Sequence, residues 1–327
     1  MDSRYAYAVG YIRALENKLL PRHIFQQLAA SEGEAAFLRT LEATPYSGAG
    51  AGGLPAFLEE KGRELSALVK KLMVDDLLKE IAGLPYDYYN LSALLSAKGA
   101  VPGIQPFLYE ERGSVETRAL KEAVFENRYR HVPEHIAAAI ERAEKVSADF
   151  ENPALIAVAA EREYFHALDE KCARAGGGFF AEYSAGVSDV YNLATFFRVR
   201  LLGAGAATLK AALSEAGSIR PAVYSAWHKA GFESIPAEIA RSPYGVLAEK
   251  GEECIREGKS LAAVEAMGDG IIFSLLARAG MVVMGPEPVL AYNIRKEHEM
   301  KLLRIISAGV RASSGAGMIN ERIYLPS

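Results

Sequence analysis

The amino-acid sequence predicts an all-α protein made of three similar helical domains. The 327 residues are rich in Ala, Leu, Glu, Lys and Arg, and alternating β-branched runs are absent, which favours helices over strands. A Tyr-Asn-apolar phrase occurs three times, at residues 89–91, 191–193 and 292–294, with intervals of about 100 residues. We therefore predict helical units at residues 1–110, 111–212 and 213–327.

The repeated phrase places one Tyr-Asn pair in each predicted unit. Asparagine can bond to neighbouring backbone, and tyrosine packs its ring while its hydroxyl finds a partner. We predict that these six positions are structural, and coincidence is the alternative, because the chain contains 16 tyrosines. The positions are Tyr89, Asn90, Tyr191, Asn192, Tyr292 and Asn293.

A second repeated phrase links the first and third units. The residues Leu-Glu-Glu-Lys-Gly-Arg-Glu at 58–64 resemble Leu-Ala-Glu-Lys-Gly-Glu-Glu at 247–253. A Pro-Tyr turn precedes each copy, at Thr44-Pro45-Tyr46 and at Ser242-Pro243-Tyr244. The middle unit lacks this phrase, so its equivalence to the other two is the less secure part of the repeat.

Individual helices follow from apolar spacing and end signals, taken in chain order. An apolar face predicts a first helix over residues 4–20, with Ser3 as N-cap and Pro21 as stop. A long helix is expected over residues 55–81. Asp87 and Asp189 each lie three residues before a repeated Asn, and we expect them to cap the helices that carry the Tyr-Asn phrase.

Later end signals complete the helical pattern. Gly99 is expected to close the first Tyr-Asn helix. Asn152-Pro153 predicts the start of a helix that runs to about residue 175 and ends at three consecutive glycines, 176–178. In the third unit Pro288 is expected in the first helical turn.

Composition excludes several classes of protein. The formal net charge of −4 and the pI near 6.0 argue against sequence-independent nucleic-acid binding. The two cysteines, Cys172 and Cys254, are far apart in helical patterns, which predicts reduced buried thiols and favours a cytosolic compartment. The N-terminus has no secretory pattern, and the most apolar stretch, 271–284, is too short to span a bilayer.

Two motifs suggest chemistry that their surroundings do not favour. His131-Val132-Pro133-Glu134-His135 matches the inverted zinc-peptidase pattern, but Pro133 separates the histidines and indicates a helix start. The glycine-rich segment 48–53 fits Gly-x-Gly-x-x-Gly without a preceding strand, and no Walker-type loop occurs. We expect no catalytic residue, no metal, no cofactor and no direct nucleotide binding, although a zinc hydrolase using the 131–135 region remains an alternative.

Several short motifs, in order along the whole chain, resemble one known family. They are Tyr5-x-Tyr7, the run from Arg13 to Leu20, Thr44-Pro45-Tyr46, the run from Tyr292 through Lys296-Glu297-x-Glu299 to Leu303-Arg304-Ile305-Ile306, and Glu321-Arg322-Ile323. Together with the repeats, they are similar to the C subunits of the V-type (archaeal and bacterial A/V-type) rotary ATPases, whose vacuolar counterparts are the d subunits.

The resemblance implies both an architecture and a role. The architecture is three similar all-helical domains in a pseudo-threefold, funnel-shaped arrangement. The role is that of a non-catalytic central-stalk subunit, a socket that couples the D and F shaft subunits to the membrane rotor ring of proteolipid subunits during ATP-linked proton or sodium transport. Such a chain would be peripheral, on the cytoplasmic side of the membrane. The alternative from another class is a helical-repeat adaptor or scaffold unrelated to rotary ATPases.

Overall fold

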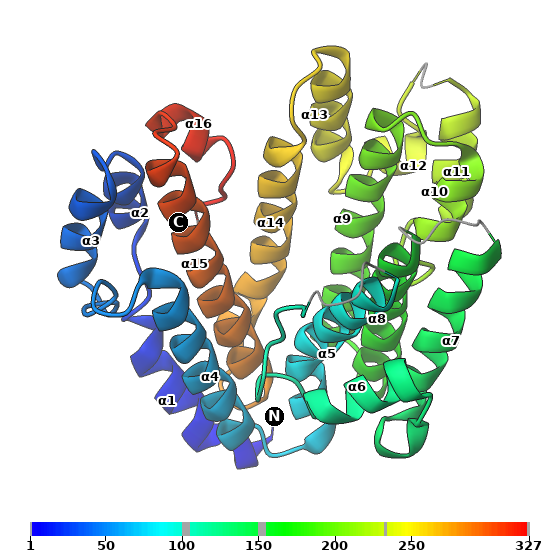
Figure 1. The fold of residues 1–327 in the computed structure, drawn as a ribbon. Coiled ribbons are helices and arrows are strands. Elements are labelled where there is room, and N and C mark those ends of the chain that lie inside the picture. Colours follow the sequence, from blue (N-terminus) through cyan, green and yellow to red (C-terminus); the bar gives the residue numbers. More distant parts are fainter. Residues whose placement is uncertain (1, 100–104, 150–154, 232–233, 326–327) are drawn as a thin grey trace. The chain divides into compact units, whose positions relative to one another are not determined.

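The fold is helical throughout the part of the chain that the structure describes. The computed structural model describes residues 2–99, 105–149, 155–231 and 234–325. These ranges contain sixteen α-helices and three short 3₁₀-helices, and no strand (Figure 1). The predicted all-α class is therefore confirmed.

The chain divides into two compact units. One unit comprises residues 1–74 and 257–327, and the other comprises residues 75–256. The two chain ends therefore belong to the same unit. A compact unit is defined by its internal contacts, whereas a sequence repeat is defined by equivalent positions. The predicted boundaries of three repeated domains are a different division and stay a prediction.

In the first unit the helix α15 (Glu287–Arg311) is the central element. It packs against α1 (Ala6–Glu16), α2 (Arg22–Ala29), α3 (Glu34–Glu42) and α4 (Leu54–Leu72). Its apolar residues Met300, Leu303 and Ile306 are fully buried, and the polar residues His298 and Glu299 are buried beside them. Two further helices, α14 (Ala262–Leu276) and α16 (Ala316–Asn320), complete the unit.

In the second unit the helix α8 (Leu155–Arg174) occupies the centre. It packs against α5 (Asp76–Lys98), α7 (Glu134–Asp149), α9 (Phe179–Leu201) and α10 (Ala206–Ala212). The remaining helices are α6 (Thr117–Glu126), α11 (Pro221–Lys229), α12 (Ala237–Ala240) and α13 (Gly245–Arg256). The turn between α8 and α9 uses positive φ at glycines 176, 177 and 178, which explains the predicted break there.

Several predicted features are confirmed. Pro288 lies in the first turn of α15, and Gly99 is the residue at which α5 ends, although its φ of −87° is not left-handed. Both cysteines are free and buried. The glycine-rich residues 48–53 form turns and bends between α3 and α4, with a helix rather than a strand before them. Asn152-Pro153 lies outside the described residues.

The predicted N-terminal helix is shorter than expected. A 3₁₀-helix over Ser3–Tyr5 leads into α1, which ends at Glu16 rather than near residue 20. The cap is Asp2 instead of Ser3, since the Asp2 carboxylate accepts from the Arg4 backbone N–H at 3.0 Å. Pro21 marks a helix start, because its extended backbone immediately precedes α2.

The second correction concerns the helices around residues 55–98. The predicted helix over residues 55–81 is two helices, because α4 ends at Leu72 and α5 begins at Asp76. The α5 helix then continues through Pro85, so it does not begin at the Tyr-Asn phrase. Asp87 is consequently a mid-helix residue, and Asp189 is likewise inside α9, so neither caps its own helix.

Candidate functional site

A buried carboxylate in the middle of α5 fastens the backbone that leads into α6. Asp87 is fully buried, and its oxygens accept from the backbone N–H groups of Ser114 and Val115, both at 2.9 Å. The Ser114 hydroxyl also donates to Asp87. Burying a charge is costly unless it is hydrogen-bonded, and these three donors satisfy the requirement.

The same arrangement recurs between α9 and α11. Asp189 is fully buried and accepts from the backbone N–H groups of Ser218 and Ile219, both at 3.0 Å, and from the Ser218 hydroxyl at 2.6 Å. The helix that follows is α11, which begins at Pro221. We call these two arrangements the aspartate clamps.

A glycine makes each aspartate clamp possible. A Cβ built on Gly113 would lie 2.1 Å from Asp87 Oδ1, and one built on Gly217 would lie 2.2 Å from Asp189 Oδ1. No side chain fits at such a distance, so only glycine allows the loop to approach the carboxylate. Gly-Ser-apolar at 113–115 and at 217–219 is therefore a further repeated phrase, which sequence reasoning missed although its spacing is close to that of the Tyr-Asn repeat.

The repeated asparagines add a second tie beside each aspartate. The Asn90 side chain donates to the Tyr109 carbonyl at 3.0 Å and accepts from the Tyr109 N–H at 2.8 Å. Asn192 makes the same pair of bonds with Ser214, at 2.9 and 2.8 Å. An Asp and an Asn one helical turn apart thus bind one incoming loop at two points.

The neighbouring tyrosines are placed differently in the two copies. Tyr191 is buried, and its hydroxyl donates to the Ala212 carbonyl at 3.0 Å. Tyr89 is 45% exposed on α5. Burial, with a smaller contribution from Glu161, raises the pKa of Tyr191 above its ordinary value, which is consistent with a neutral donor.

The third copy uses a different carboxylate. Tyr292 and Asn293 are buried on α15, but Leu290 stands three residues before Asn293, where the other copies have aspartate. The buried carboxylate of α15 is instead Glu299, which accepts from the Leu20 N–H at 2.5 Å and from the Tyr46 hydroxyl at 2.7 Å. Leu20 directly precedes Pro21 and α2, so Glu299 also fastens the approach to a short helix. Lys296 completes its partners.

The two Pro-Tyr turns are alike in structure as well as in sequence. The Thr44 hydroxyl donates to the Leu41 carbonyl at 2.6 Å and accepts from the Tyr46 N–H at 3.1 Å. Ser242 makes the corresponding bonds with the Ile239 carbonyl at 2.7 Å and the Tyr244 N–H at 3.1 Å.

Each Pro-Tyr turn places its tyrosine hydroxyl beside a buried carboxylate. Burial first, and then the charge of Glu299, raise the pKa of Tyr46 well above its ordinary value. Burial first, and then the charge of Asp189 and a hydrogen bond to it, raise the pKa of Tyr244. Both hydroxyls therefore stay protonated and can serve as permanent donors to the carboxylates.

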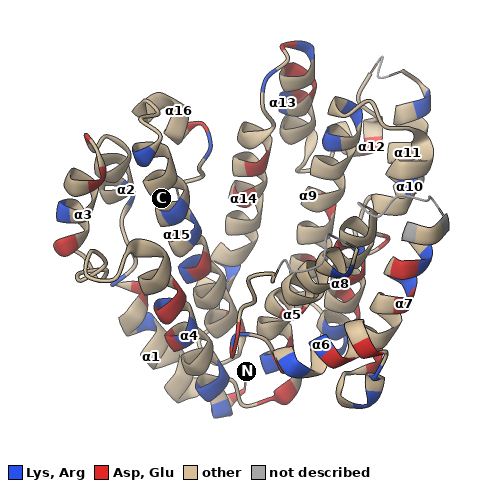
Figure 2. Cartoon of the chain, viewed as in Figure 1, with Lys and Arg blue, Asp and Glu red and all other residues tan. Residues whose placement is uncertain are grey.

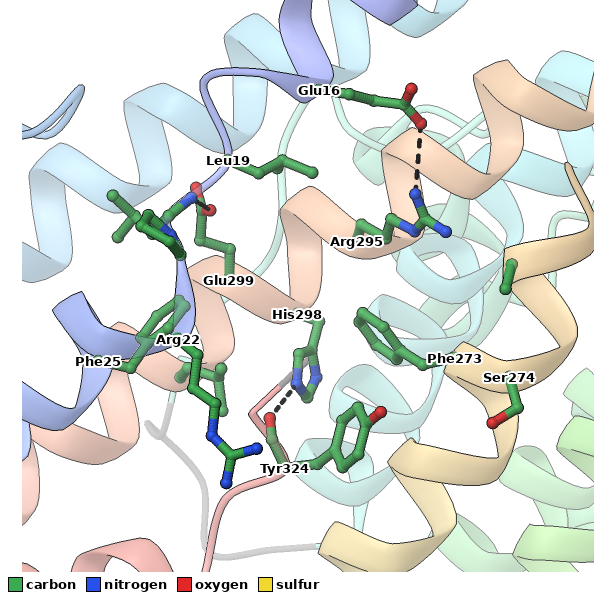
Figure 3. A pocket seen from close by; sticks show the side chains of 14 residues that line it. Glu16, Leu19, Arg22, Phe25, Phe273, Ser274, Arg295, His298, Glu299 and Tyr324 are labelled. Carbon is green, nitrogen blue, oxygen red and sulfur yellow. Dashed lines mark hydrogen bonds and ion pairs between the residues drawn. The ribbon is translucent and has the colours of Figure 1, made fainter. Parts of the chain in front are cut away.

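A cavity in the first unit lies beside Glu299. It has a volume of about 520 Å³ and is lined by apolar side chains such as Phe25 and Phe273 and by charged ones (Figure 3). Glu16 is already paired with Arg13 at 2.7 Å and with Arg295 at 3.3 Å. Both cavity carboxylates are thus engaged by cations or donors, so neither is placed as a general base.

A histidine closes one side of this cavity. His298 Nε2 lies 2.9 Å from the Tyr324 carbonyl, which ties the C-terminal segment to α15 (Figure 3). Burial is the main cause that lowers the pKa of His298, so its neutral form donates this bond through Nε2. This contact is a structural tie.

The structure separates the two histidines of the zinc-like motif. His131 ends a 3₁₀-helix, and α7 begins at Glu134 directly after Pro133, as predicted. His131 lines a hollow beside Glu116 and Glu122, whereas His135 lines another with Tyr88 and Glu163. Within the described ranges no group of three or more His, Cys, Asp or Glu is arranged to hold a metal ion.

These features define an all-helical protein whose buried polar groups fasten helices to one another. The model of the ATP synthase (C/AC39) subunit family matches residues 8–322, so the chain belongs to that family. No curated protein matches the chain significantly. Among the described residues, no helix is long and apolar enough to cross a bilayer.

Proposed function

We propose that this chain is the non-catalytic central-stalk subunit of a V/A-type rotary ATPase. In this role it is a socket that couples the D and F shaft subunits to the proteolipid rotor ring. The single observation that carries the proposal is the family match, which covers residues 8–322. The proposed location is peripheral, on the cytoplasmic side of the membrane.

The hydrogen-bond pattern supports a mechanical role. A part that transmits torque has to keep its helices in fixed register, and tightly packed interiors transmit strain. Asp87, Asp189 and Glu299 each bind the backbone in front of a short helix, by charge-assisted bonds that break at a high energetic cost when buried. We propose that the three Tyr-Asn positions and their neighbouring buried carboxylates mark equivalent places in three repeated domains.

The zinc-hydrolase alternative has less support. A zinc site would need His131 and His135 to reach one metal ion, but the two side chains line separate hollows. No specific observation favours a general helical-repeat adaptor over the rotor subunit.

The test is reconstitution of the rotary complex with and without this chain. We expect the isolated catalytic headpiece to hydrolyse ATP at an unchanged rate in its absence, because the proposed socket takes no part in hydrolysis. ATP-driven ion transport by the whole complex should be abolished, because the shaft is no longer connected to the ring. Ion transport that continues without the chain would refute the coupling role.

A control shows whether the loss of ion transport is caused by the missing chain and not by damage during its removal. The chain is added back to the depleted complex, and ATP hydrolysis and ion transport are measured in parallel on the same membranes. Recovery of ion transport on re-addition is the expected result. Loss of headpiece hydrolysis without the chain would instead indicate a catalytic contribution.

A further inference from the structure

Three aromatic side chains form an exposed patch where α5 meets the segment that Asn90 binds. Tyr89 is 45% exposed and Phe107 is 58% exposed. Their rings meet on Tyr109, with centroid distances of 4.7 Å from Tyr89 and 5.1 Å from Phe107. We call Tyr89, Phe107 and Tyr109 the α5 aromatic patch.

The central ring of the patch, that of Tyr109, is held in place by Asn90 and Arg112. Asn90 binds both the N–H and the carbonyl of Tyr109. The buried Arg112 guanidinium lies 4.7 Å from the Tyr109 ring centroid and 4.1 Å from that of Tyr86. Cation–π contacts and two backbone hydrogen bonds fix the orientation of the central ring. Preorganised aromatic surfaces lose little conformational entropy on binding, which is why such residues dominate protein interfaces.

The corresponding site around Asn192 shows that the fold can form without exposed aromatic rings at this position. Asn192 makes the same two backbone bonds, yet its neighbour Tyr191 is only 8% exposed, and the bound segment at Leu213 and Ser214 is buried. In the first copy Asn90 makes the same pair of backbone bonds, but Tyr89 and Phe107 are exposed to solvent. Exposed aromatic rings that contact one another form a contiguous apolar patch, which is the kind of surface that marks an interaction site.

The charge around the patch selects the partner. Glu110 and Glu116 are exposed on the α5–α6 segment, while Arg112, the one cation among residues 105–116, is buried. The acidic residues of this segment are coloured red in Figure 2. Acidic residues on this segment repel anionic lipid and nucleic acid and attract Lys and Arg, whose cations also stack on aromatic faces.

We propose that the α5 aromatic patch docks an arginine- or lysine-bearing segment of a protein partner. Aromatic rings supply the contact area, and the glutamates on the same segment supply the attraction. The proposal names a surface and a partner chemistry beyond the socket role. It does not require that role, because a basic segment of any protein would fit.

Photocrosslinking in the purified native complex tests the proposal. The tagged full chain carries a benzophenone amino acid in place of Phe107 and is isolated with its partners by mild solubilisation of native membranes. Irradiation should join it to another protein, within a peptide that contains Lys or Arg next to the crosslinked residue. The same probe in place of Phe125, 48% exposed on α6 outside the patch, is the matched control and should not give this product.

Every outcome decides the proposal. A crosslink to lipid, to a peptide without Lys or Arg, or only to neighbouring residues of this chain would overturn it. The internal crosslink also confirms that the probe reacted. A basic segment from a protein outside the rotary ATPase would uphold the patch while refuting the rotor role. A coupling-competent complex with internal crosslinks alone would do the reverse.

Surface variants give an independent measurement. Phe107→Ser combined with Tyr89→Ser should lower recovery of the crosslinked partner about tenfold, as expected for loss of interface anchors. Glu110→Lys combined with Glu116→Lys should lower recovery further at low salt than at high salt. Phe125→Ser should leave recovery unchanged. Unaltered thermal unfolding of each variant shows that the fold is retained, and unchanged recovery by both patch variants would contradict the proposal.

Discussion

At the scale of single residues, the most informative groups are carboxylates that are buried and fully used. A buried carboxylate without partners destabilises a fold by several kcal/mol, so its presence has to be explained by the donors around it. Asp87 and Asp189 each have two backbone N–H donors and a serine hydroxyl. Their bonding is satisfied within the chain, and these bonds give both carboxylates a structural role.

The glycine of an aspartate clamp provides the first prediction. Gly217→Ala should lower the free energy of unfolding by about 2–4 kcal/mol, because the new methyl group would displace the Asp189 carboxylate from its donors. Urea denaturation measures the change. Gly205→Ala is the control, since nothing lies within 4 Å of its Cβ position and its φ of −79° suits alanine. Equal stabilities of the two variants would show that the close approach does not matter.

A second prediction concerns the buried carboxylate of α15. Glu299→Leu should lower the free energy of unfolding by about 3–5 kcal/mol, because it leaves the Leu20 N–H, the Tyr46 hydroxyl and Lys296 without their acceptor. Glu321→Leu is the control at an exposed glutamate. Calorimetry on both variants makes the comparison, and similar melting temperatures would mean that Glu299 is dispensable.

At the scale of elements, proline and glycine positions predicted helix ends correctly where no tertiary contact favoured a different structure. Glu134 begins α7 directly after Pro133, Pro288 lies in the first turn of α15, and the three glycines separate α8 from α9. The same reasoning failed at Asp87, which we expected to cap a new helix carrying the Tyr-Asn phrase. There α5 continues, because burial of its following residues and the bonds to Ser114 outweigh the lost backbone hydrogen bond.

Other features could not be predicted from local sequence at all. Glu299 meets Leu20 and Tyr46, which lie more than 250 positions earlier in the chain. No periodicity reports a contact of that kind. The spacing of the Tyr-Asn phrase did identify residues beside the clamps, but which Tyr is exposed depends on the segment that packs over it. Tyr89 and Tyr191 share their sequence context and differ in burial for that reason.

The contact between His135 on α7 and Tyr88 on α5 gives a prediction about pH. Burial, helped by the charge of Lys171, lowers the pKa of His135 from its ordinary 6.5 to about 4, while Glu80 and Glu170 act in the opposite direction. The folded state therefore binds this proton less tightly than the unfolded state. The contribution of His135 is complete above pH 6.5 and is lost progressively as the pH falls towards 4.

His135→Phe tests this linkage while keeping a ring stacked on Tyr88, since the two rings lie 6.0 Å apart at 17°. The variant should lose less stability between pH 7 and pH 4 than the natural chain, as measured by urea unfolding at each pH. His166→Phe, at an exposed histidine beside the same hollow, is the control and should keep the natural slope. Identical slopes for all three proteins would refute the assignment.

At the scale of the whole molecule, the proposed rotor role predicts that the isolated chain binds neither ATP nor zinc and catalyses no reaction. A ligand that binds the native state raises its stability in proportion to the logarithm of ligand concentration, by about 2.7 kcal/mol at a hundredfold excess over the dissociation constant. We expect neither ATP nor zinc to have this effect. The glycine-rich residues 48–53 follow a helix and a Pro-Tyr turn instead of a strand, so they lack the setting of a phosphate loop. The motif histidines line different hollows.

Thermal unfolding of the isolated chain is the measurement. The melting temperature should be the same with and without millimolar magnesium-ATP, and the same after chelation as after addition of zinc. A catalytic headpiece subunit treated in parallel should show the shift that ATP binding produces. An increase in the melting temperature of this chain that grows with the logarithm of ligand concentration would contradict the non-catalytic assignment. Because that increase reports binding to the native state alone, it would do so even if the chain had no measurable turnover.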